Sequence, residues 1–551
     1  MERRQFLKAG LLASASALLS RATVFGAAAD SHIEILVNEP IGTISPNIYG
    51  HFAEHLGGVI YDGIWVGEDS KIPNNNGIRT ALAEALRKVH APVIRWPGGC
   101  FADSYDWKDG IGPRNQRPRR TNFWAGAREA KQHKTGVQEF ETNAFGTADF
   151  VRFCRLSGAE PYIAANIRSL PPLDFDHWVE YCNSPTGSTT LADQRARDGL
   201  RDPLNVRYWG VGNESWGCGG NFLPEDYATE FRRYTTWVPG YGVELAFVAS
   251  GSNGDDLDWT HRFFEELLGR RRYFPQSWWG WSVHHYAENL ARGRTMDWIA
   301  RKGDALQFDP VDYYELLHEA DRMESIVLGN WNTMGEFDHQ HRIKLVVDEY
   351  GPWYKSGSEI DPTHLLGQQI TMRDAIATAL TLDTFNRHAE KVGMAACAQL
   401  INCLNSLFLA HQDRFIVTAN YHVFQMYASH QSSQAVRAEF SSPEVAYDRD
   451  GKPAHFWGLK GSASVQNKNL VLTVVNPHLE QPRETEIAVR GANVNSGSAT
   501  VLASSDIHAH NTFDQPDAVR TKEALPPEPR DGIIHFTFPP ASVTRLTLAL
   551  Q

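Results

Sequence analysis

The stretch Lys344-Leu345-Val346-Val347-Asp348-Glu349-Tyr350 has the pattern of a buried β-strand that ends in carboxylates. A second stretch of similar length and character, Tyr208-Trp209-Gly210-Val211-Gly212-Asn213-Glu214, also ends in a glutamate. A carboxylate at the C-terminal end of a buried parallel strand lies at the rim of a (β/α)8 barrel, where the catalytic groups of such folds gather. Two facing carboxylates most often break a glycosidic bond, because one protonates the leaving oxygen while the other attacks or stabilises the sugar carbon. The two glutamates therefore predict a glycosidase.

From about residue 46 onward, short apolar runs alternate with longer amphipathic stretches, which is typical of βαβ units around a parallel sheet. Eight runs are predicted strands: 48–53, 93–96, 161–166, 207–212, 245–251, 281–286, 343–348 and 393–401. Helical apolar spacing predicts helices over 78–89, 147–156, 224–236, 259–268, 311–328 and 368–386. Eight parallel strands with an outer ring of helices predict an α/β fold of the TIM-barrel type.

After about residue 415 the pattern changes to alternating β-rich segments separated by Gly, Pro, Asn and Asp, which predicts an antiparallel β-sandwich. The 551 residues have room for both domains. The predicted organisation is an N-terminal strand at 30–45 that joins the sandwich, a (β/α)8 barrel at 46–410 and the sandwich at 411–551.

Residues 1–29 resemble a twin-arginine export signal. They hold Arg3 and Arg4, then a short Ala/Leu/Ser run, then three alanines that end at Ala29. The run is short for a membrane-spanning helix, so cleavage near Ala29 is favoured over an uncleaved anchor. The expected location is periplasmic or secreted, with no membrane association after cleavage.

The net charge of −12 and the pI near 6.0 argue against a nucleic-acid partner, since nucleic-acid-binding proteins usually carry a basic surface. The basic cluster Arg114, Arg117, Arg119 and Arg120 is interpreted as a solvated loop, with a contribution to a substrate cleft as the alternative. Six cysteines with no Cys-x-x-Cys pair do not make a disulfide scaffold, and we interpret them as buried small apolar groups.

Glu214 follows Asn213, whose amide is suited to bind a sugar hydroxyl, although an Asn-Glu pair is also common in exposed loops. Glu349 directly follows a buried strand, where a charge is costly without compensation. An ion pair with Arg95 is the structural alternative, and it is compatible with catalysis because an arginine keeps a nucleophilic carboxylate ionised. The pairing of the two glutamates favours the catalytic interpretation of both.

The segment His284-His285-Tyr286 ends the sixth predicted strand and brings a phenol toward the carboxylate of the seventh. A metal site is the alternative, but no His/Asp spacing of the zinc type accompanies it, so neither a metal nor a cofactor is predicted. Among the sixteen tryptophans, most are expected in the core. Those in loops after strands, Trp107, Trp216 and Trp353, are expected near a sugar ring.

Seven motifs, in order along nearly the whole chain after residue 29, resemble the α-L-arabinofuranosidases of glycoside hydrolase family 51. They are GHFAEHLG (50–57), RWPGGCFAD (95–103), WGVGNESWGCGG (209–220), DEYG (348–351), TMRDA (371–375), AQLIN (398–402) and YHVFQMY (421–427). The chain departs from common forms of the family at 57–63 and 166–172. Both segments lie on or near the expected catalytic face, where they bear on the aglycone preference.

The resemblance implies a retaining, exo-acting enzyme that releases terminal arabinofuranose from arabinan, arabinoxylan or derived oligosaccharides, with Glu214 as acid/base and Glu349 as nucleophile. It also implies that Glu54, Asn213, Tyr286 and Gln399 line the sugar pocket, with Cys100 contributing through its backbone. Arg95 would support Glu349. Family members often form hexamers, which makes a homo-oligomer an expected assembly.

Two other functions are considered. An endo-acting β-glycanase on the same scaffold would need an open groove, and the sizes of its products would identify it. A non-catalytic sugar-binding protein would bind arabinose without hydrolysing it. The presence of both glutamates, Asn213 and Tyr286 argues against the second alternative.

Overall fold

Eight parallel strands close into a barrel in the order β10-β11-β12-β13-β2-β5-β8-β9, as the α/β prediction required. The computed structural model describes residues 29–127, 139–288, 297, 300, 302–527, 529–530 and 532–551. The barrel strands are β2 (Gly50–Phe52), β5 (Val93–Trp96), β8 (Glu160–Ala165), β9 (Tyr208–Val211), β10 (Ala246–Asn253), β11 (Trp278–Ala287), β12 (Lys344–Pro352) and β13 (Val392–Ala398). Their residues are almost all buried, which explains why they appear in the sequence as continuous apolar runs.

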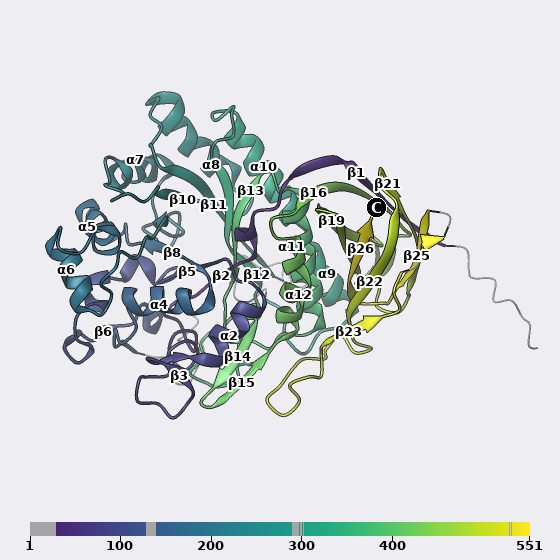
Figure 1. Ribbon diagram of the computed structural model, residues 1–551, viewed down its shortest axis with the longest axis horizontal. Coiled ribbons are helices and arrows are strands. Elements are labelled where there is room, and N and C mark those ends of the chain that lie inside the picture. The colour runs from purple at the N-terminus through teal and green to yellow at the C-terminus, as the bar shows by residue number, and fades with distance from the viewer. Residues whose placement is uncertain are drawn as a thin grey trace, which may run out of the picture.

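Helices surround the barrel and follow its strands in sequence (Figure 1). They are α2 (Thr80–Lys88), α4 (Thr147–Ser157), α5 (Pro172–Asn183), α6 (Thr190–Arg197), α7 (Pro224–Thr235), α8 (Leu257–Phe264), α9 (Pro310–Asp321), α10 (Met323–Gly335) and α11 (Met372–Arg387). The single helix predicted over 311–328 is two helices that break at Arg322. Helix α5 was not predicted, although its buried residues Phe175, Trp178, Val179 and Cys182 have helical spacing.

The loops on the C-terminal side of the barrel carry short elements of their own. A hairpin of β14 (Phe408–His411) and β15 (Arg414–Val417) follows β13, and the two-residue strands β6 (Arg120–Thr121) and β7 (Phe140–Glu141) pair in the long loop after β5. Helix α12 (Ala419–Tyr427) then leads out of the barrel.

The second domain is built on one ten-stranded sheet in the order β23-β22-β26-β20-β19-β16-β1-β21-β25-β24. Its strands are β1 (Ser31–Thr43), β16 (Gln434–Ser441), β19 (Lys460–Gln466), β20 (Asn469–Asn476), β21 (Arg483–Arg490), β22 (Val494–Ala503), β23 (Thr521–Ala524), β24 (Pro529–Arg530), β25 (Ile533–Phe538) and β26 (Ser542–Leu550). Every pair in it is antiparallel except β1 with β21. Apolar residues of β1, β20, β21, β25 and β26 share one core, so the sheet folds over on itself into two facing layers.

Helix α11 packs between the barrel and this sheet (Figure 1). Its buried Asp383 accepts hydrogen bonds from Ser462 Oγ and Thr473 Oγ1 of the sheet, each at 2.6 Å, and from Tyr427 Oη at 2.8 Å. The two domains are therefore joined by buried polar contacts as well as by apolar packing. In the part of the chain that the structure describes, no helix combines the length and the apolar character needed to span a bilayer.

Candidate active site

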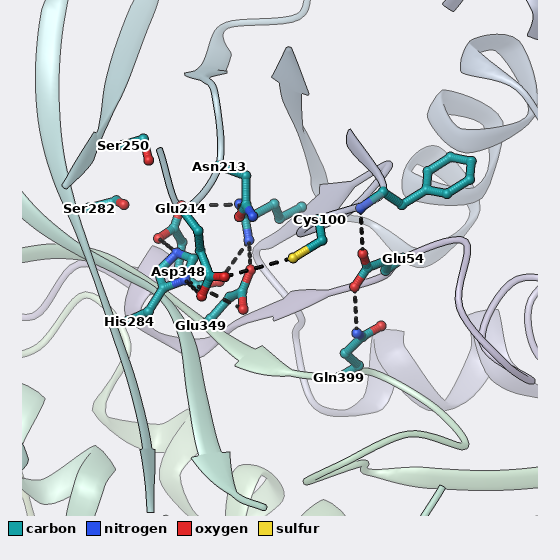
Figure 2. A network of polar contacts seen from close by, with 12 residues as sticks. Glu54, Cys100, Asn213, Glu214, Ser250, Ser282, His284, Asp348, Glu349 and Gln399 are labelled. Carbon is teal, nitrogen blue, oxygen red and sulfur yellow. Dashed lines mark hydrogen bonds and ion pairs between the residues drawn. The ribbon is translucent and has the colours of Figure 1, made fainter. Parts of the chain in front are cut away.

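Glu214 and Glu349 both approach one nitrogen of the His284 imidazole at the C-terminal end of the barrel (Figure 2). His284 Nδ1 is 3.0 Å from Glu214 Oε1 and 3.5 Å from Glu349 Oε2. One oxygen of each glutamate lies within 4.8 Å of the other. The carboxyl groups of retaining glycosidases are about 5–5.5 Å apart and those of inverting enzymes about 6.5–9.5 Å apart, so this proximity favours the retaining geometry.

A β-bulge in β12 turns two consecutive acidic residues toward the same network. Ser282 pairs with Val346 and His284 pairs with Glu349, so two residues of β11 span three of β12. In a regular strand Asp348 and Glu349 would face opposite sides. The extra residue at the bulge lets both carboxylates contact His284 and Arg95, which is a common use of bulges beside active sites.

Glu349 is held by a cation and a phenol. Arg95 Nη1 donates to Oε1 at 2.8 Å, and Tyr286 Oη donates to Oε2 at 2.8 Å. The Glu349 side chain is only 7% exposed. Burial raises the pKa of Glu349 and the Glu214 carboxylate adds to that rise, while the charges of His284 and Arg95 act in the opposite sense. The two cations are what favours an ionised carboxylate in this buried position.

His284 carries a positive charge at neutral pH. Burial lowers its pKa, but Glu349, Asp348 and Glu214 together raise the pKa to about 10. The imidazolium donates from Nδ1 to Glu214 Oε1 and from Nε2 to Asp348 Oδ1, each at 3.0 Å. Burial opposes ionisation of Asp348, yet the Arg95 charge and hydrogen bonds from His284 and Tyr162 hold the pKa of Asp348 at about 2. Asp348 is therefore ionised at neutral pH, and its negative charge balances the positive charges of Arg95 and His284 beside the two glutamates.

Glu214 has a left-handed backbone, with φ at 41°, and its side chain keeps 18% exposure. Its Oε2 lies 3.8 Å from Cys100 Sγ and 3.5 Å from Cys218 Sγ. These two cysteines form a disulfide, which corrects the interpretation of all six as buried small apolar groups. The sequence did not indicate this pair because 118 residues separate the two cysteines and only the fold brings them together. Cys154, Cys182, Cys397 and Cys403 are buried, as predicted, and are free thiols.

Asn213 is positioned from two sides. Its Oδ1 accepts a 2.6 Å hydrogen bond from Arg95 Nη2, and its backbone N–H donates to Asp103 Oδ2 at 3.1 Å. Asp103 is fully buried and also accepts from the backbone N–H of Ile167 at 2.9 Å. Gly219 packs so closely on this segment that a Cβ would lie 1.7 Å from the Asn213 carbonyl oxygen. The loop after β9 therefore has little freedom around the Asn213–Glu214 pair.

Glu54, at the end of β2, lies on the far side of the site from Glu214 (Figure 2). Its Oε1 accepts from the Phe101 backbone N–H at 2.9 Å and from Trp124 Nε1 at 3.2 Å, and its Oε2 accepts from Gln399 Nε2 at 3.0 Å. Burial, reinforced by the Glu349 charge, raises the pKa of Glu54 to about 8. Glu54 is accordingly a mostly neutral carboxyl at pH 7, able to donate as well as accept.

All the predicted site residues meet in this region: Glu54, Arg95, Cys100, Asn213, Glu214, Tyr286, Glu349 and Gln399. Sequence reasoning did not assign a role to His284, Asp348, Tyr162 or Trp124. His284 was detectable in principle, because it lies two residues before Tyr286 on one strand and so faces the same side. Tyr162 and Trp124 carried no such signal, since their partners are distant in sequence.

The expectation for Trp107 is wrong, and that for the basic cluster holds only in part: Arg119 and Arg120 are exposed, whereas the side chain of Arg117 is not. Trp107 is 1% exposed and stacks on Trp178 in the core, so it is not placed to contact a sugar. Its loop folds back because Trp107 Nε1 donates to the Asp174 carbonyl at 3.1 Å. Arg117 is not solvated: its side chain is 5% exposed and lies 3.5 Å from the buried Asp149. Trp353 remains beside the site, where its ring packs edge-on against Tyr286.

Two protein-family models match the chain. The model described as "Alpha-L-arabinofuranosidase 1 domain" matches residues 85–291, and "Alpha-L-arabinofuranosidase C-terminal domain" matches residues 348–542. An intracellular exo-α-L-arabinofuranosidase of Bacteroides ovatus is 33% identical over 98% of this chain and 100% of its own length. α-L-Arabinofuranosidase C of Emericella nidulans is 28% identical over 83% of this chain and 86% of its own length.

Solved structures agree with these matches. The GH51 arabinofuranosidase of Xanthomonas axonopodis pv. citri superposes with a TM-score of 0.86 at 32% identity, covering 95% of this chain and 100% of that one. An arabinose complex of the α-L-arabinofuranosidase of Thermotoga maritima gives a TM-score of 0.78 at 28% identity, with coverage of 94% and 100%.

The expected periplasmic or secreted location is wrong. The relative that aligns with 98% of the chain is named an intracellular enzyme. The expectation rested on the composition of residues 1–29, which hold an arginine pair and a short apolar run. Such a pattern of composition does not indicate any contact with the folded domains. Residues 1–28 of that segment lie outside the described residues.

Proposed function

The chain belongs to glycoside hydrolase family 51, and from this membership we propose a role for each residue of the site in a retaining, exo-acting α-L-arabinofuranosidase. The enzyme releases terminal non-reducing arabinofuranose from arabinan, arabinoxylan or derived oligosaccharides by double displacement. The observation that carries the assignment of roles is the pair of carboxylates, Glu214 and Glu349, with oxygens within 4.8 Å of each other.

In the first step a carboxylate oxygen of Glu349 attacks the anomeric carbon and forms an ester bond to the sugar while the glycosidic bond breaks. Arg95 and His284 stabilise the anionic form of Glu349 until it attacks. The phenol of Tyr286, 2.8 Å from Oε2, fixes the orientation of the carboxylate. Arg95 thus supports the nucleophile without touching the sugar.

Glu214 donates its proton to the departing oxygen. Its Oε1 already accepts from His284, so the proton to be transferred belongs on Oε2, beside the Cys100–Cys218 disulfide. In the second step Glu214 takes a proton from water, the water oxygen bonds to the anomeric carbon, and the ester to Glu349 breaks. Two inversions at one carbon give net retention of configuration.

Substrate recognition is proposed for the groups around this pair. Asn213, held by Arg95 and Asp103, would present its amide nitrogen to a sugar hydroxyl. Glu54 and Gln399 would bind further hydroxyls from the opposite wall, and the Cys100 backbone would contribute beside them. The neutral carboxyl of Glu54 suits this role, because a second fixed anion near Glu349 would raise the pKa of the nucleophile further.

Hydrolysis of 4-nitrophenyl α-L-arabinofuranoside tests the assignment of the two glutamates. Glu349→Ala is expected to lower kcat by about 10⁴-fold or more without unfolding the protein. Glu214→Ala is expected to slow substrates with poor leaving groups by about 10²–10⁴-fold and the nitrophenyl glycoside much less, because only poor leaving groups need protonation. Equal losses on both kinds of substrate would refute the acid/base role of Glu214.

Two further measurements address the alternatives and the assembly. Release of arabinose alone from arabinoxylan is expected, whereas a ladder of oligosaccharides would identify an endo-acting glycanase. Arabinose binding without turnover in the folded wild type would identify a sugar-binding protein. We also propose a homo-oligomer, a hexamer by family resemblance, which light scattering coupled to size-exclusion chromatography checks.

A further inference from the structure

A cluster of two histidines and two aspartates lies outside the catalytic network, where three barrel loops meet. Asp62 belongs to the loop after β2, Asp361 and His364 to the loop after β12, and His411 to the end of β14. His364 Nε2 is 3.2 Å and His411 Nδ1 is 2.9 Å from the same oxygen, Asp62 Oδ2. His364 is 2% exposed, and Asp62 and His411 are 28% and 21% exposed, so the cluster is part-buried but reachable from solvent.

Two of the three distances among these atoms are close to the ligand spacing of a tetrahedral zinc site. Zinc binds histidine nitrogen and carboxylate oxygen at about 2.0–2.2 Å, which places neighbouring ligand atoms about 3.3 Å apart. The two nitrogen–oxygen distances, 3.2 and 2.9 Å, are within a few tenths of an ångström of that value, and all three ligand atoms lie within 4.8 Å of one another. Three protein ligands leave a fourth position for water.

The contacts around the cluster fit a metal better than hydrogen bonding between neutral side chains. His411 Nε2 is 3.6 Å from Asp361 Oδ2. If a neutral His411 donated from Nδ1 to Asp62, its Nε2 would carry no proton. The lone pair of Nε2 would then face the Asp361 carboxylate, which is an unfavourable contact. A metal on Nδ1 leaves Nε2 protonated, and Nε2 then donates to Asp361. A carboxylate behind a ligating histidine is the usual outer contact of zinc sites.

The contacts of Asp62 also orient its carboxylate toward the two histidines. Its second oxygen, Oδ1, accepts from the Gln412 backbone N–H at 2.8 Å, which leaves Oδ2 to face the two histidines. Arg79 Nη2 lies 3.7 Å from Oδ1, and the Arg79 guanidinium donates to the carbonyls of Asp62, Gly63 and Gln412. The two aspartates and Arg79 together give a net charge of −1, which favours a divalent cation.

We propose that Asp62, His364 and His411 bind one Zn²⁺ ion, with Asp361 as the outer partner of His411, and that this ion joins the loops after β2, β12 and β13. These strands are neighbours in the barrel, and they carry Glu54, Glu349 and, just after β13, Gln399. The loops already approach closely: Asn402 Nδ2 donates to the Gly58 carbonyl at 2.9 Å, and a Cβ on Gly58 would lie 2.4 Å from the His364 ring. The metal adds a coordinate link to one wall of the sugar pocket.

Zinc binding to the full-length protein tests the proposal. After stripping with EDTA, titration calorimetry with ZnCl₂ and elemental analysis of the dialysed protein are expected to give one retained Zn²⁺ per chain at this site. Asp62→Asn and His411→Gln are expected to abolish that binding. Asp361→Asn is expected to weaken it by about 10- to 100-fold, the usual cost of losing an outer carboxylate. Substitution with Co²⁺ should give the visible d–d bands of a tetrahedral complex in the wild type and not in Asp62→Asn.

Two control variants separate this site from other places where zinc can bind. His261→Gln removes an exposed histidine that lies 3.5 Å from Glu336 and is expected to leave binding unchanged. Glu214, His284 and Glu349 also offer ligand atoms within 4.8 Å of one another, so Glu349→Gln is measured as well, and it is expected to keep the ion at Asp62.

The proposal is overturned if the stripped wild type, after addition of ZnCl₂ and dialysis, retains no zinc. It is also overturned if Asp62→Asn and His411→Gln bind zinc as the wild type does. The loop-joining role has its own readout: zinc is expected to raise the Tm of the wild type and not that of Asp62→Asn. Stoichiometric binding with no change in Tm would refute that role. The Asp62→Asn side chain keeps an acceptor oxygen for the Gln412 N–H, so this variant is expected to fold, and His411→Gln provides the second, independent variant.

Discussion

At the scale of single residues, the catalytic pair depends on a charge that neither glutamate supplies. His284 contacts Glu214, Glu349 and Asp348, and its pKa of about 10 makes it a cation throughout the neutral range. With Arg95 it balances the charges of Asp348 and Glu349. The positive charge favours ionisation of the nucleophile, while the N–H directed at Glu214 Oε1 fixes the orientation of the acid. We assign His284 as a positioning residue for both carboxyl groups.

Replacement of His284 by Gln is expected to lower kcat by about 10²-fold, the scale seen when one preorganised donor is removed from an active site. The pH profile distinguishes positioning from a purely structural role. Removing a positive charge beside Glu349 raises the pKa of Glu349, so at a given pH a smaller fraction of the nucleophile is ionised. The acid limb of the profile of kcat/KM against pH is therefore expected to move to higher pH.

His285→Gln is the matched control for this variant. His285 is the next residue on β11, but its Nε2 contacts the backbone carbonyl of Glu319 at 2.7 Å and faces away from Glu214 and Glu349. Its profile should keep the wild-type acid limb. A His284→Gln profile with an unmoved acid limb would contradict the electrostatic part of the argument.

At the scale of elements, the site depends on how strand ends and loops are fixed relative to each other. The bulge in β12 directs Asp348 and Glu349 into one network, and the left-handed backbone at Glu214 turns its carboxyl toward them. The loop after β5 and the loop after β9 are then joined by the Cys100–Cys218 disulfide, directly beside Glu214 Oε2. These features act on backbone geometry, so they leave little trace in local sequence.

The double variant Cys100→Ser/Cys218→Ser is expected to lose about 2–4 kcal/mol of the free energy of unfolding, because the cross-link closes a long loop in the unfolded chain. Urea denaturation followed by circular dichroism measures this. Dithiothreitol should lower the stability of the wild type by a similar amount and leave the double variant unchanged. A wild type that is insensitive to the reductant while the variant is destabilised would show that the loss comes from packing and not from the cross-link.

At the scale of the whole molecule, the barrel and the sheet share helix α11. Asp383 at its buried face accepts from Ser462, Thr473 and Tyr427, and nearby Asn386 donates to Ser462 Oγ at 3.0 Å. Strand β1, at the start of the described chain, pairs with β16 and β21, so the sheet contains segments from both ends of the sequence. Completing the sheet therefore closes a loop that contains the whole barrel.

Asp383→Ala is expected to destabilise the protein by about 3 kcal/mol, because it leaves the hydroxyls of Ser462, Thr473 and Tyr427 buried without their acceptor. Differential scanning calorimetry is expected to show a lower Tm, with the barrel and sheet transitions moving apart. Asp383→Asn keeps one acceptor oxygen and should lose less. An unchanged Tm in Asp383→Ala would mean that apolar packing alone joins the two domains.

The sequence alone was enough to predict the fold class and to select the two glutamates as the catalytic candidates. Buried parallel strands must be continuously apolar, and a charged residue at their ends is conspicuous against that background. The period of the apolar pattern likewise separated barrel strands from the alternating strands of the C-terminal sheet. The motifs from residue 50 to residue 427 carried the family resemblance, because several of them include the groups that form the site or support it.

Only the tertiary structure decided which groups act on those glutamates. His284, Asp348 and Tyr162 come from three different strands, and the Cys100–Cys218 disulfide and the contacts of Asp62 with His364 and His411 join residues more than a hundred positions apart. Such contacts depend on strand order, register and a bulge, none of which a local pattern encodes. The same reason explains why Trp107 and Arg117 were misplaced: both lie in loops by sequence, and both are buried because those loops fold back onto the barrel.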